Sequence, residues 1–177
     1  MPKGEREQFG VYYELRDYAT LWRRLLIDVV DVPVALAISV ALVAAAAEFD
    51  DTPELLVAVL ASVWFGYFVL LKASRYRTLG YIVAKARIVD LAGDRPGIFS
   101  LILRLMFVVG GPLNSLIDLL WLTGDPYRQA LRDKFASTYV IRQDAVPIGA
   151  GVVRVRTYTF WGMTFLFREV TRAKAAA

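Results

Sequence analysis

Two long stretches without a charged residue constrain this chain more than any other feature. Sixteen uncharged residues follow Asp31, and seventeen follow Glu54. A bilayer core about 30 Å thick needs roughly 20 apolar residues in an α-helix. We therefore predict membrane helices over Leu25–Ala47 and Glu54–Leu71. Because 57% of the 177 residues are hydrophobic, against about 45–50% in soluble domains, the composition argues against an ordinary soluble domain.

A third hydrophobic stretch, Ile98–Leu122, is also long enough to cross a bilayer, but it is broken near its middle. The break is Gly110-Gly111-Pro112, and proline interrupts helical hydrogen bonding. The two halves, Ile98–Val109 and Leu113–Leu122, are each too short for a straight crossing. The stretch either crosses as one kinked helix or returns as a helical hairpin.

The distribution of Lys and Arg favours the hairpin. Residues 1–24 contain five, residues 72–97 contain six and residues 123–177 contain nine, whereas residues 48–54 contain four acids and no base. The positive-inside rule then places the three basic segments in the cytoplasm. The first 20 residues are too charged for a signal peptide. We therefore expect a multi-pass protein of the inner (plasma) membrane with a cytoplasmic N-terminus.

The polar segments contain short alternating patterns that are typical of β-strands. Gly10–Arg16 and Ile82–Asp90 alternate between two faces, and Val152–Thr159 with Met163–Phe167 is typical of an aromatic-rich β-hairpin.

The expected fold class follows from these elements. We predict an all-α membrane protein with two transmembrane helices, a broken third hydrophobic stretch and small β-rich cytoplasmic elements. Residues 1–142 would form the transmembrane domain with an N-terminal strand, and residues 143–177 the cytoplasmic tail hairpin.

Charged residues gather at the start of the first predicted membrane helix. Arg24, Asp28 and Asp31 are spaced by four and three positions, which places them on one helical face. A charge inside a bilayer costs roughly 2.5–3.5 kcal/mol or more, so two carboxylates there need partners. Arg24 can neutralise one of them. The other needs a proton, a bound ion or a second cation, for which Arg104 and Lys85 are candidates.

Two interpretations of these charges stay open. Burial and a neighbouring carboxylate both favour a protonated carboxyl group, so Asp28 and Asp31 are candidates for a proton or ion site. Alternatively, the charges form structural pairs that fasten the first helix to its neighbours. The same alternatives apply to Arg104 and to Asp118, a further charge in the third stretch.

The residue types present exclude several functional classes. The chain has no cysteine and no histidine, which excludes thiolate metal sites and a thiol nucleophile and removes the usual general base. It has no phosphate-binding glycine loop and no nucleophile elbow. We therefore expect no enzyme, no cofactor and no metal. The net charge of +4 comes from bases that flank apolar segments, which points to the lipid bilayer and not to nucleic acid.

Three motifs carry a resemblance to a known family. The run Tyr18–Arg24 leading to Asp31, the Thr78-Leu79-Gly80 and Arg87–Asp90 segments, and Asp125–Ile141 together resemble the RDD family of prokaryotic membrane proteins, named for one arginine and two aspartates. The resemblance implies a polar cluster of Arg24, Asp31 and Asp133.

The chain departs from the family pattern at three positions that bear on this cluster. Asp28 is an extra acid in the first helix, Tyr81 stands where a lysine is common, and Arg132 stands where a histidine is common. Asp133 lies in a helix-like segment, Tyr127–Phe135. We predict that Asp133 folds back onto Arg24 at the cytoplasmic interface.

The resemblance implies a bacterial membrane protein, and transport has been suggested for such proteins. Our first hypothesis is a transporter or transporter subunit that moves a cation or small solute, with proton coupling at the Arg/Asp cluster. Because two spans and a hairpin enclose little of a pathway, it requires a homo-oligomer or a membrane partner protein. The second hypothesis is a non-transport scaffold or assembly factor in which the cluster is structural.

Overall fold

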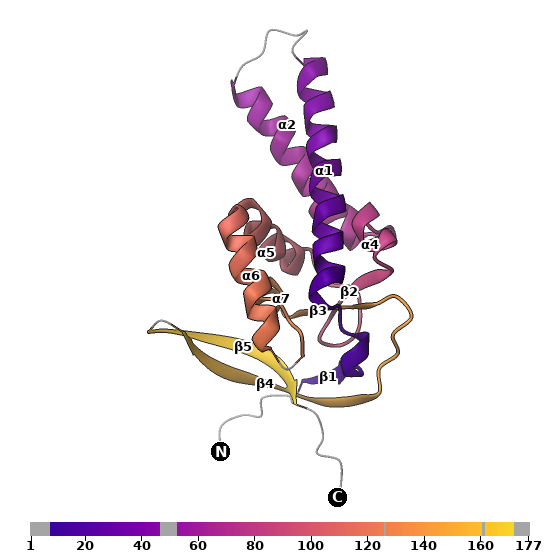
Figure 1. Ribbon diagram of the computed structural model, residues 1–177, viewed down its shortest axis with the longest axis vertical. Coiled ribbons are helices and arrows are strands. Elements are labelled where there is room, and N and C mark those ends of the chain that lie inside the picture. The colour runs from indigo at the N-terminus through magenta and orange to yellow at the C-terminus, as the bar shows by residue number, and fades with distance from the viewer. Residues whose placement is uncertain (1–7, 47–52, 126, 161, 172–177) are drawn as a thin grey trace, which may run out of the picture.

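The fold combines a tall helical part with two antiparallel sheets at one end (Figure 1). The computed structural model describes residues 8–46, 53–125, 127–160 and 162–171. Residues 48–52 of the predicted acidic loop lie outside the described residues. The predicted all-α class is too narrow, because strands at both ends of the chain join in one sheet.

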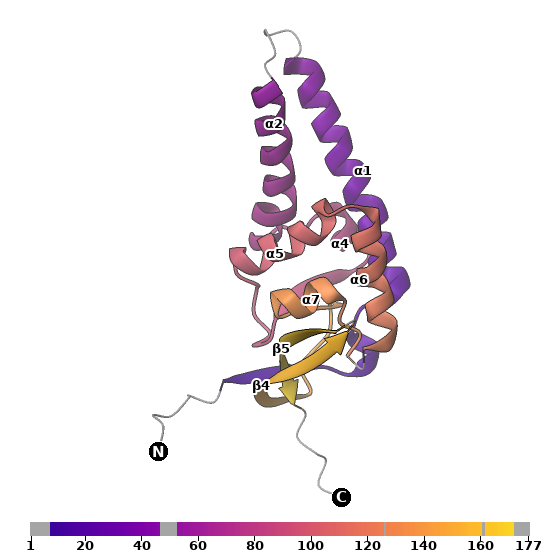
Figure 2. The same ribbon diagram turned by 90° about the vertical axis from the view of Figure 1, so that its left-hand side faces the viewer.

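Two helices in the described residues are long and apolar enough to cross a membrane. The first is α1 (Leu21–Ala46). The second is formed by α2 (Pro53–Phe65), a π-helical turn η2 (Gly66–Leu70) and α3 (Leu71–Ala73). At 1.5 Å per residue their 26 and 21 residues span about 39 and 31 Å. Figure 2 shows them side by side. Both helices predicted from the uncharged stretches are therefore present.

The third hydrophobic stretch forms two helices, α5 (Ile98–Val109) and α6 (Pro112–Gly124), at an angle of 114° to each other. Gly111 lies between them with φ of +91°, a conformation that favours glycine. Strand β2 (Ala86–Asp90) precedes α5 and strand β3 (Thr138–Arg142) follows α6. Since β2 and β3 pair antiparallel, the α5–α6 pair starts and ends at the same end of the fold. This arrangement agrees with the helical hairpin, which is one of the two alternatives predicted for residues 98–122.

The second sheet joins the two ends of the chain. Its order is β1 (Phe9–Tyr12), β4 (Gly149–Phe160) and β5 (Met163–Thr171). The tail hairpin is present as β4 and β5, and β1 pairs antiparallel with β4 so that Phe9 lies opposite Val152. Strands β4 and β5 thus share a sheet with the N-terminal strand β1.

Several short elements differ from their predicted extents. The predicted strand Ile82–Asp90 splits into a short helix, α4 (Leu79–Val83), and β2. The two are separated at Lys85, whose φ of 47° is left-handed. The predicted N-terminal strand is cut short by the 3-10 turn η1 (Leu15–Asp17).

The helix-like segment predicted at 127–135 is a helix only over α7 (Leu131–Ala136). The residues before α7 form a turn in which both Tyr127 N and Gln129 N donate to Asp125 Oδ1, each at 2.9 Å. A carboxylate that binds backbone N–H groups in this way favours a turn over a helix.

The tail hairpin packs onto α6 and α7 through aromatic rings. Phe135 of α7 lies 5.1 Å from Phe167 of β5, and Trp121 of α6 lies 5.8 Å from Tyr158 of β4, between ring centroids. These separations are typical of favourable aromatic pairs. The hairpin therefore lies against α6 and α7.

Candidate functional site

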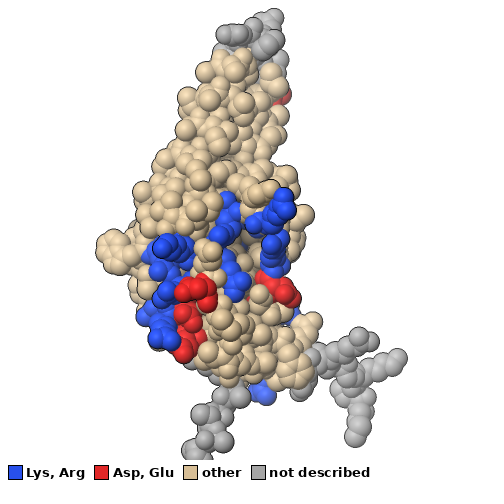
Figure 3. Space-filling model, turned by 90° about the vertical axis from the view of Figure 1, so that its right-hand side faces the viewer, with Lys and Arg blue, Asp and Glu red and all other residues tan. Residues whose placement is uncertain are grey.

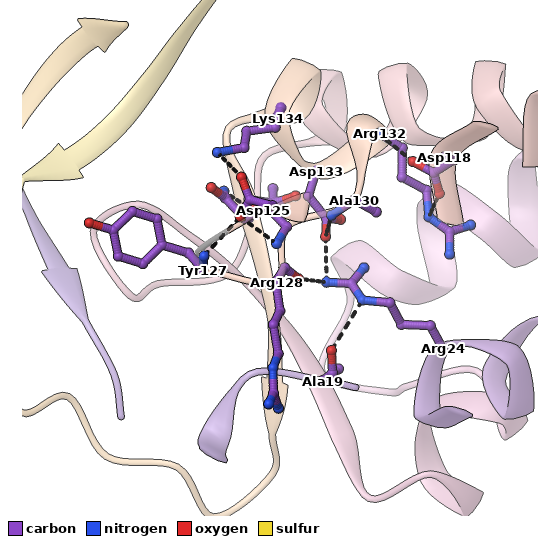
Figure 4. Close-up of polar contacts among 12 residues, drawn as sticks. Ala19, Arg24, Asp118, Asp125, Tyr127, Arg128, Ala130, Arg132, Asp133 and Lys134 are labelled. Atoms are coloured by element: carbon purple, nitrogen blue, oxygen red, sulfur yellow. Dashed lines mark hydrogen bonds and ion pairs between the residues drawn. The ribbon is translucent and has the colours of Figure 1, made fainter. Parts of the chain in front are cut away.

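Asp133 is the centre of a buried ion-pair cluster. It lies in the first turn of α7, where Ala130 N donates to its Oδ2 at 3.1 Å. Arg24 Nη2 of α1 lies 2.6 Å from Asp133 Oδ2, and Arg104 of α5 pairs with Asp133 Oδ1. Figure 4 shows Arg24 reaching Asp133 from α1. The structure thus brings Arg24 and Asp133 together, as we predict from the family resemblance.

The surroundings keep Asp133 ionised. Its residue is fully buried, and burial alone would raise the pKa of its carboxyl group. The positive charges of Arg24, Arg104 and Arg132 outweigh burial and hold the pKa of Asp133 well below its usual range. Arg104 also donates to Thr138 Oγ1 at 2.9 Å and to the Tyr81 hydroxyl at 3.3 Å. The cluster therefore connects α1, α5, α7 and β3.

Arg132 bridges two further carboxylates. Its Nη1 and Nη2 donate to Asp28 Oδ1 and Oδ2 at 3.3 and 3.0 Å. Its Nε lies 3.0 Å from Asp118 Oδ2, and its backbone N–H donates to Asp118 Oδ1 at 2.6 Å. The Asp118 residue is 1% exposed, whereas the Asp28 side chain is 30% exposed. Arg132 therefore ties α7 to both α1 and α6.

Asp31 occupies a separate polar pocket on the same side of α1. Thr78 Oγ1 donates to it at 2.6 Å, Gly80 N at 2.7 Å and the Tyr67 hydroxyl at 3.0 Å. Lys72 Nζ lies 3.8 Å from Asp31 Oδ2. Tyr67 belongs to the π-helical turn, and such turns frequently occur at functional sites.

The close approach of Gly80 explains the Thr-Leu-Gly motif. A Cβ atom on Gly80 would lie 2.4 Å from Ile27 O and 2.8 Å from Asp31 Oδ1. Only glycine lets the start of α4 contact α1 this closely. The motif therefore holds α4 against α1 and supplies two donors to Asp31.

The partners of the acids on α1 differ from those predicted. Arg24 pairs with Asp133 and not with Asp28 or Asp31, and the expected single cluster of Arg24, Asp31 and Asp133 is divided into two sites. Neither Arg104 nor Lys85, the two candidates for neutralising the second carboxylate on α1, takes that role. Arg104 pairs with Asp133, and Lys85 is exposed at the break before β2. Residues on one helical face point in the same direction, but each contacts the element that packs against its own position along the helix axis.

Sequence reasoning did not assign five residues that complete these sites, and one of them is Arg132, the partner of Asp28 and Asp118. Lys72, Tyr67 and Thr78 surround Asp31, and Tyr81 contacts Arg104. Two signals were available. Lys72 is the first charge after the second apolar stretch, and Thr78 opens the Thr-Leu-Gly motif.

A second ion-pair group links the closing motif to the tail. Lys134 Nζ lies 2.6 Å from Asp125 Oδ2 and pairs with Glu169 of β5. The Tyr158 hydroxyl donates to Glu169 Oε1 at 2.6 Å. Burial alone would lower the pKa of Lys134, but Asp125 and Glu169 raise it above its usual value. This group attaches the hairpin to α7.

The ion pairs around Asp133, Arg132 and Asp31 together form a buried charge network, and this network contains equal numbers of acids and bases. Within the part of the chain that the structure describes, no three His, Cys, Asp or Glu side chains are placed to bind a metal. Each of the network's four carboxylates has a cation within 4 Å, and there are four such cations. The carboxylates are those of Asp28, Asp31, Asp118 and Asp133, and the cations are Arg24, Lys72, Arg104 and Arg132. This arrangement can fasten helices together, and it neutralises charge that the apolar surroundings would otherwise penalise.

Two apolar helices, a bent helical pair and a charge-balanced network between them fit a membrane protein. The sequence matches the model of the RDD family over residues 18–137, and the chain belongs to that family. The match includes Arg24, Asp31 and Asp133. Comparisons with curated proteins and with solved structures found no match.

Proposed function

We propose that this RDD-family protein is a membrane scaffold whose buried charge network fixes a cytoplasmic cap against its membrane helices. The cap consists of the two β-sheets. The observation that carries the proposal is the pairing of Asp133, which is fully buried and ion-paired with Arg24 and Arg104. A transported ion or proton requires an acid that water can reach and that can change partners. A buried carboxylate held between two guanidinium groups suits attachment better than exchange.

The orientation that we propose places the cap in the cytoplasm. The start of α1 and both sheets lie in the half of the molecule away from the end of α1 (Figure 1). Figure 3 shows Lys and Arg side chains in the lower half of this face, below an upper part that shows none. By the positive-inside rule this basic end faces the cytoplasm. The chain is then a multi-pass protein of the plasma membrane with its N-terminus inside.

A scaffold also needs a surface for a partner, and the outer face of the tail hairpin offers one. Val155 and Leu166 are 64% and 67% exposed on this face. The opposite face carries Phe167, which is buried against α6 and α7. Exposed apolar side chains on a strand face are typical of interaction sites. The proposed partner is a membrane-associated protein or a second copy of this chain.

Transport is the second candidate, and one observation favours it. The carboxylate of Asp28 is 30% exposed and borders a groove of about 370 Å³ between α1 and α6. Val32, Pro33, Ser115 and Leu119 are among its lining residues. A proton or cation could reach Asp28 there and compete with Arg132. Two helices and a returning pair cannot enclose a complete pathway, so transport would require a homo-oligomer or a membrane partner.

Ion flux distinguishes the two candidates. Purified protein in proteoliposomes would be tested with sodium, potassium and lithium gradients at several pH values, with internal pH as the readout. Wild type would be compared with Asp28→Asn and Asp31→Asn, each also measured for thermal stability in detergent. The scaffold predicts no flux above empty vesicles and variants that lose only stability. Cation-driven proton flux that Asp28→Asn abolishes without loss of stability would overturn it in favour of transport.

A crosslinking experiment gives the scaffold a positive test. A photo-crosslinking amino acid would replace Leu166 on the outer face, or Lys85 as an exposed control outside the hairpin, in cells of the native organism. We expect one discrete crosslinked species from position 166 and none from position 85. The absence of any product at position 166 would contradict docking at this face.

A further inference from the structure

A basic pocket of about 240 Å³ opens where the second apolar helix meets the cap. Its walls come from the end of that helix, the segment before α4, strand β2 and the loop after β2. The pocket is lined by five basic side chains and one acid: Lys72, Arg75, Arg77, Arg87, Arg95 and Asp94. At roughly 30 Å³ for each water molecule the volume equals about eight waters, which leaves room for a small polar anion.

The arginines of this pocket differ from those of the buried network. Among the described residues, none of the four has a carboxylate within ion-pair distance. Their hydrogen bonds within the described part of the chain go to neutral groups. Arg77 donates to Ala86 O at 3.3 Å, and Arg87 donates to Ala145 O at 2.9 Å. The charges are therefore uncompensated inside the pocket, apart from the single nearby acid.

One buried hydrogen-bond donor in the pocket wall has no acceptor among the described residues. The Nε atom of Arg87 is buried and has no hydrogen-bond partner among the described residues. Buried polar groups in folded proteins are nearly always paired, and an ordered water or an ion is the usual partner of a buried donor that the chain itself leaves unpaired. Lys72 is already paired with Asp31. The four arginines exceed the single acid of the lining by three positive charges, and this excess together with the unpaired donor indicates an anion.

The chemistry of the lining selects the kind of anion. A guanidinium group binds the oxygens of phosphate with two parallel hydrogen bonds and keeps its charge at any physiological pH. Four arginines converging on one cavity suit a group that offers several oxygens and a full negative charge. Phosphate esters meet both requirements.

The position of the pocket selects the source of the phosphate. Lys72 lies in the last turn of the second apolar helix, and Arg75 follows it by three residues. Figure 3 shows the basic side chains gathered just below the uncharged part of the surface. Bases immediately next to the cytoplasmic end of a membrane helix meet the anionic headgroups of that leaflet.

We propose that this pocket binds a phosphate-bearing anion, namely the headgroup of an anionic phospholipid in the adjacent leaflet. The lipid as the source rests on the orientation proposed above. The phosphate site itself does not, because it depends only on the lining residues. The proposal also differs from the scaffold function, since neither partner docking nor ion flux enters it.

The test uses the full chain in nanodiscs of phosphatidylcholine with increasing phosphatidylglycerol, and native mass spectrometry counts retained lipids. Arg75→Gln with Arg95→Gln removes two exposed charges from the pocket. The control, Arg142→Gln with Arg154→Gln, removes two charges outside the pocket, one partly exposed and one exposed. We expect wild type and the control to retain phosphatidylglycerol preferentially, and the pocket variant to lose roughly tenfold or more in apparent affinity.

A second arm separates the two sources of phosphate. The same proteins in detergent would be titrated with inorganic phosphate and with glycerol 3-phosphate by calorimetry. Binding here that the pocket variant abolishes, without preference for phosphatidylglycerol in nanodiscs, would support the phosphate site and overturn the lipid source. Equal losses in the pocket variant and the control, or no binding in either arm, would overturn the proposal. Both faces of a nanodisc are accessible, so the result is independent of orientation and of the flux test.

Discussion

Arg132 and Asp28 are 104 residues apart in the chain, and their side chains form a two-pronged ion pair in the fold. The family resemblance leads us to expect no acid at position 28 and a histidine at position 132. The extra carboxylate and the fixed positive charge are thus partners. A guanidinium group in place of an imidazole allows Arg132 to reach Asp118 at the same time.

Replacing Arg132 should be far more damaging than replacing Asp28. Arg132→Met leaves two carboxylates without their cation, and breaking a buried pair in this way costs about 3–5 kcal/mol. Asp28→Asn should cost about 1 kcal/mol, because Asp28 is partly exposed and Arg132 keeps Asp118. Equilibrium unfolding in detergent, followed by circular dichroism, measures both. Equal costs for the two variants would refute the bridging role of Arg132.

Asp133→Asn should destabilise the fold strongly. The change removes the carboxylate between Arg24 and Arg104 and leaves two buried guanidinium groups facing each other, for a loss of about 3–5 kcal/mol. Asp144→Asn is the control, since Asp144 is exposed and its one ion pair among the described residues is with partly exposed Arg142. The control should unfold as the wild type does. Proteolysis of the detergent-solubilised protein would show whether the cap loosens.

The contribution of Asp133 should depend on pH in the acid range. Its pKa in the fold lies below the value of about 3.9 expected in an unfolded chain. The stabilisation is therefore complete above about pH 4 and is lost as the pH falls through the lowered pKa. The difference in unfolding free energy between wild type and Asp133→Asn should be constant near neutral pH and shrink below about pH 4. A constant difference down to pH 2 would mean that Asp133 acts through packing alone.

Gly80→Ala should separate α4 from α1. The added Cβ would lie 2.4 Å from Ile27 O, and relief of such overpacking costs about 1–3 kcal/mol. Gly66→Ala is the control, because a Cβ there meets nothing within 4 Å. Thermal melting in detergent should show a loss for Gly80→Ala and none for Gly66→Ala. Fluorescence of a probe on α4 would report the displacement directly.

The local patterns in the sequence determine the elements and some of their ends. Uncharged length predicts α1 and the helix over Pro53–Ala73, and the glycine–proline break predicts the division of α5 from α6. Alternation predicts the tail hairpin. These features depend on residues a few positions apart, so a single segment carries the information.

The tertiary structure alone decides which elements and charges meet. The pairing of β1 with β4 joins segments about 140 residues apart, and no pattern within either strand specifies its partner. On α1, spacing places Arg24, Asp28 and Asp31 on one face, but three different partners reach them from α7 and from the second apolar helix. A helical period determines the direction of a side chain. What lies in that direction depends on how distant elements pack, and this is a property of the whole fold.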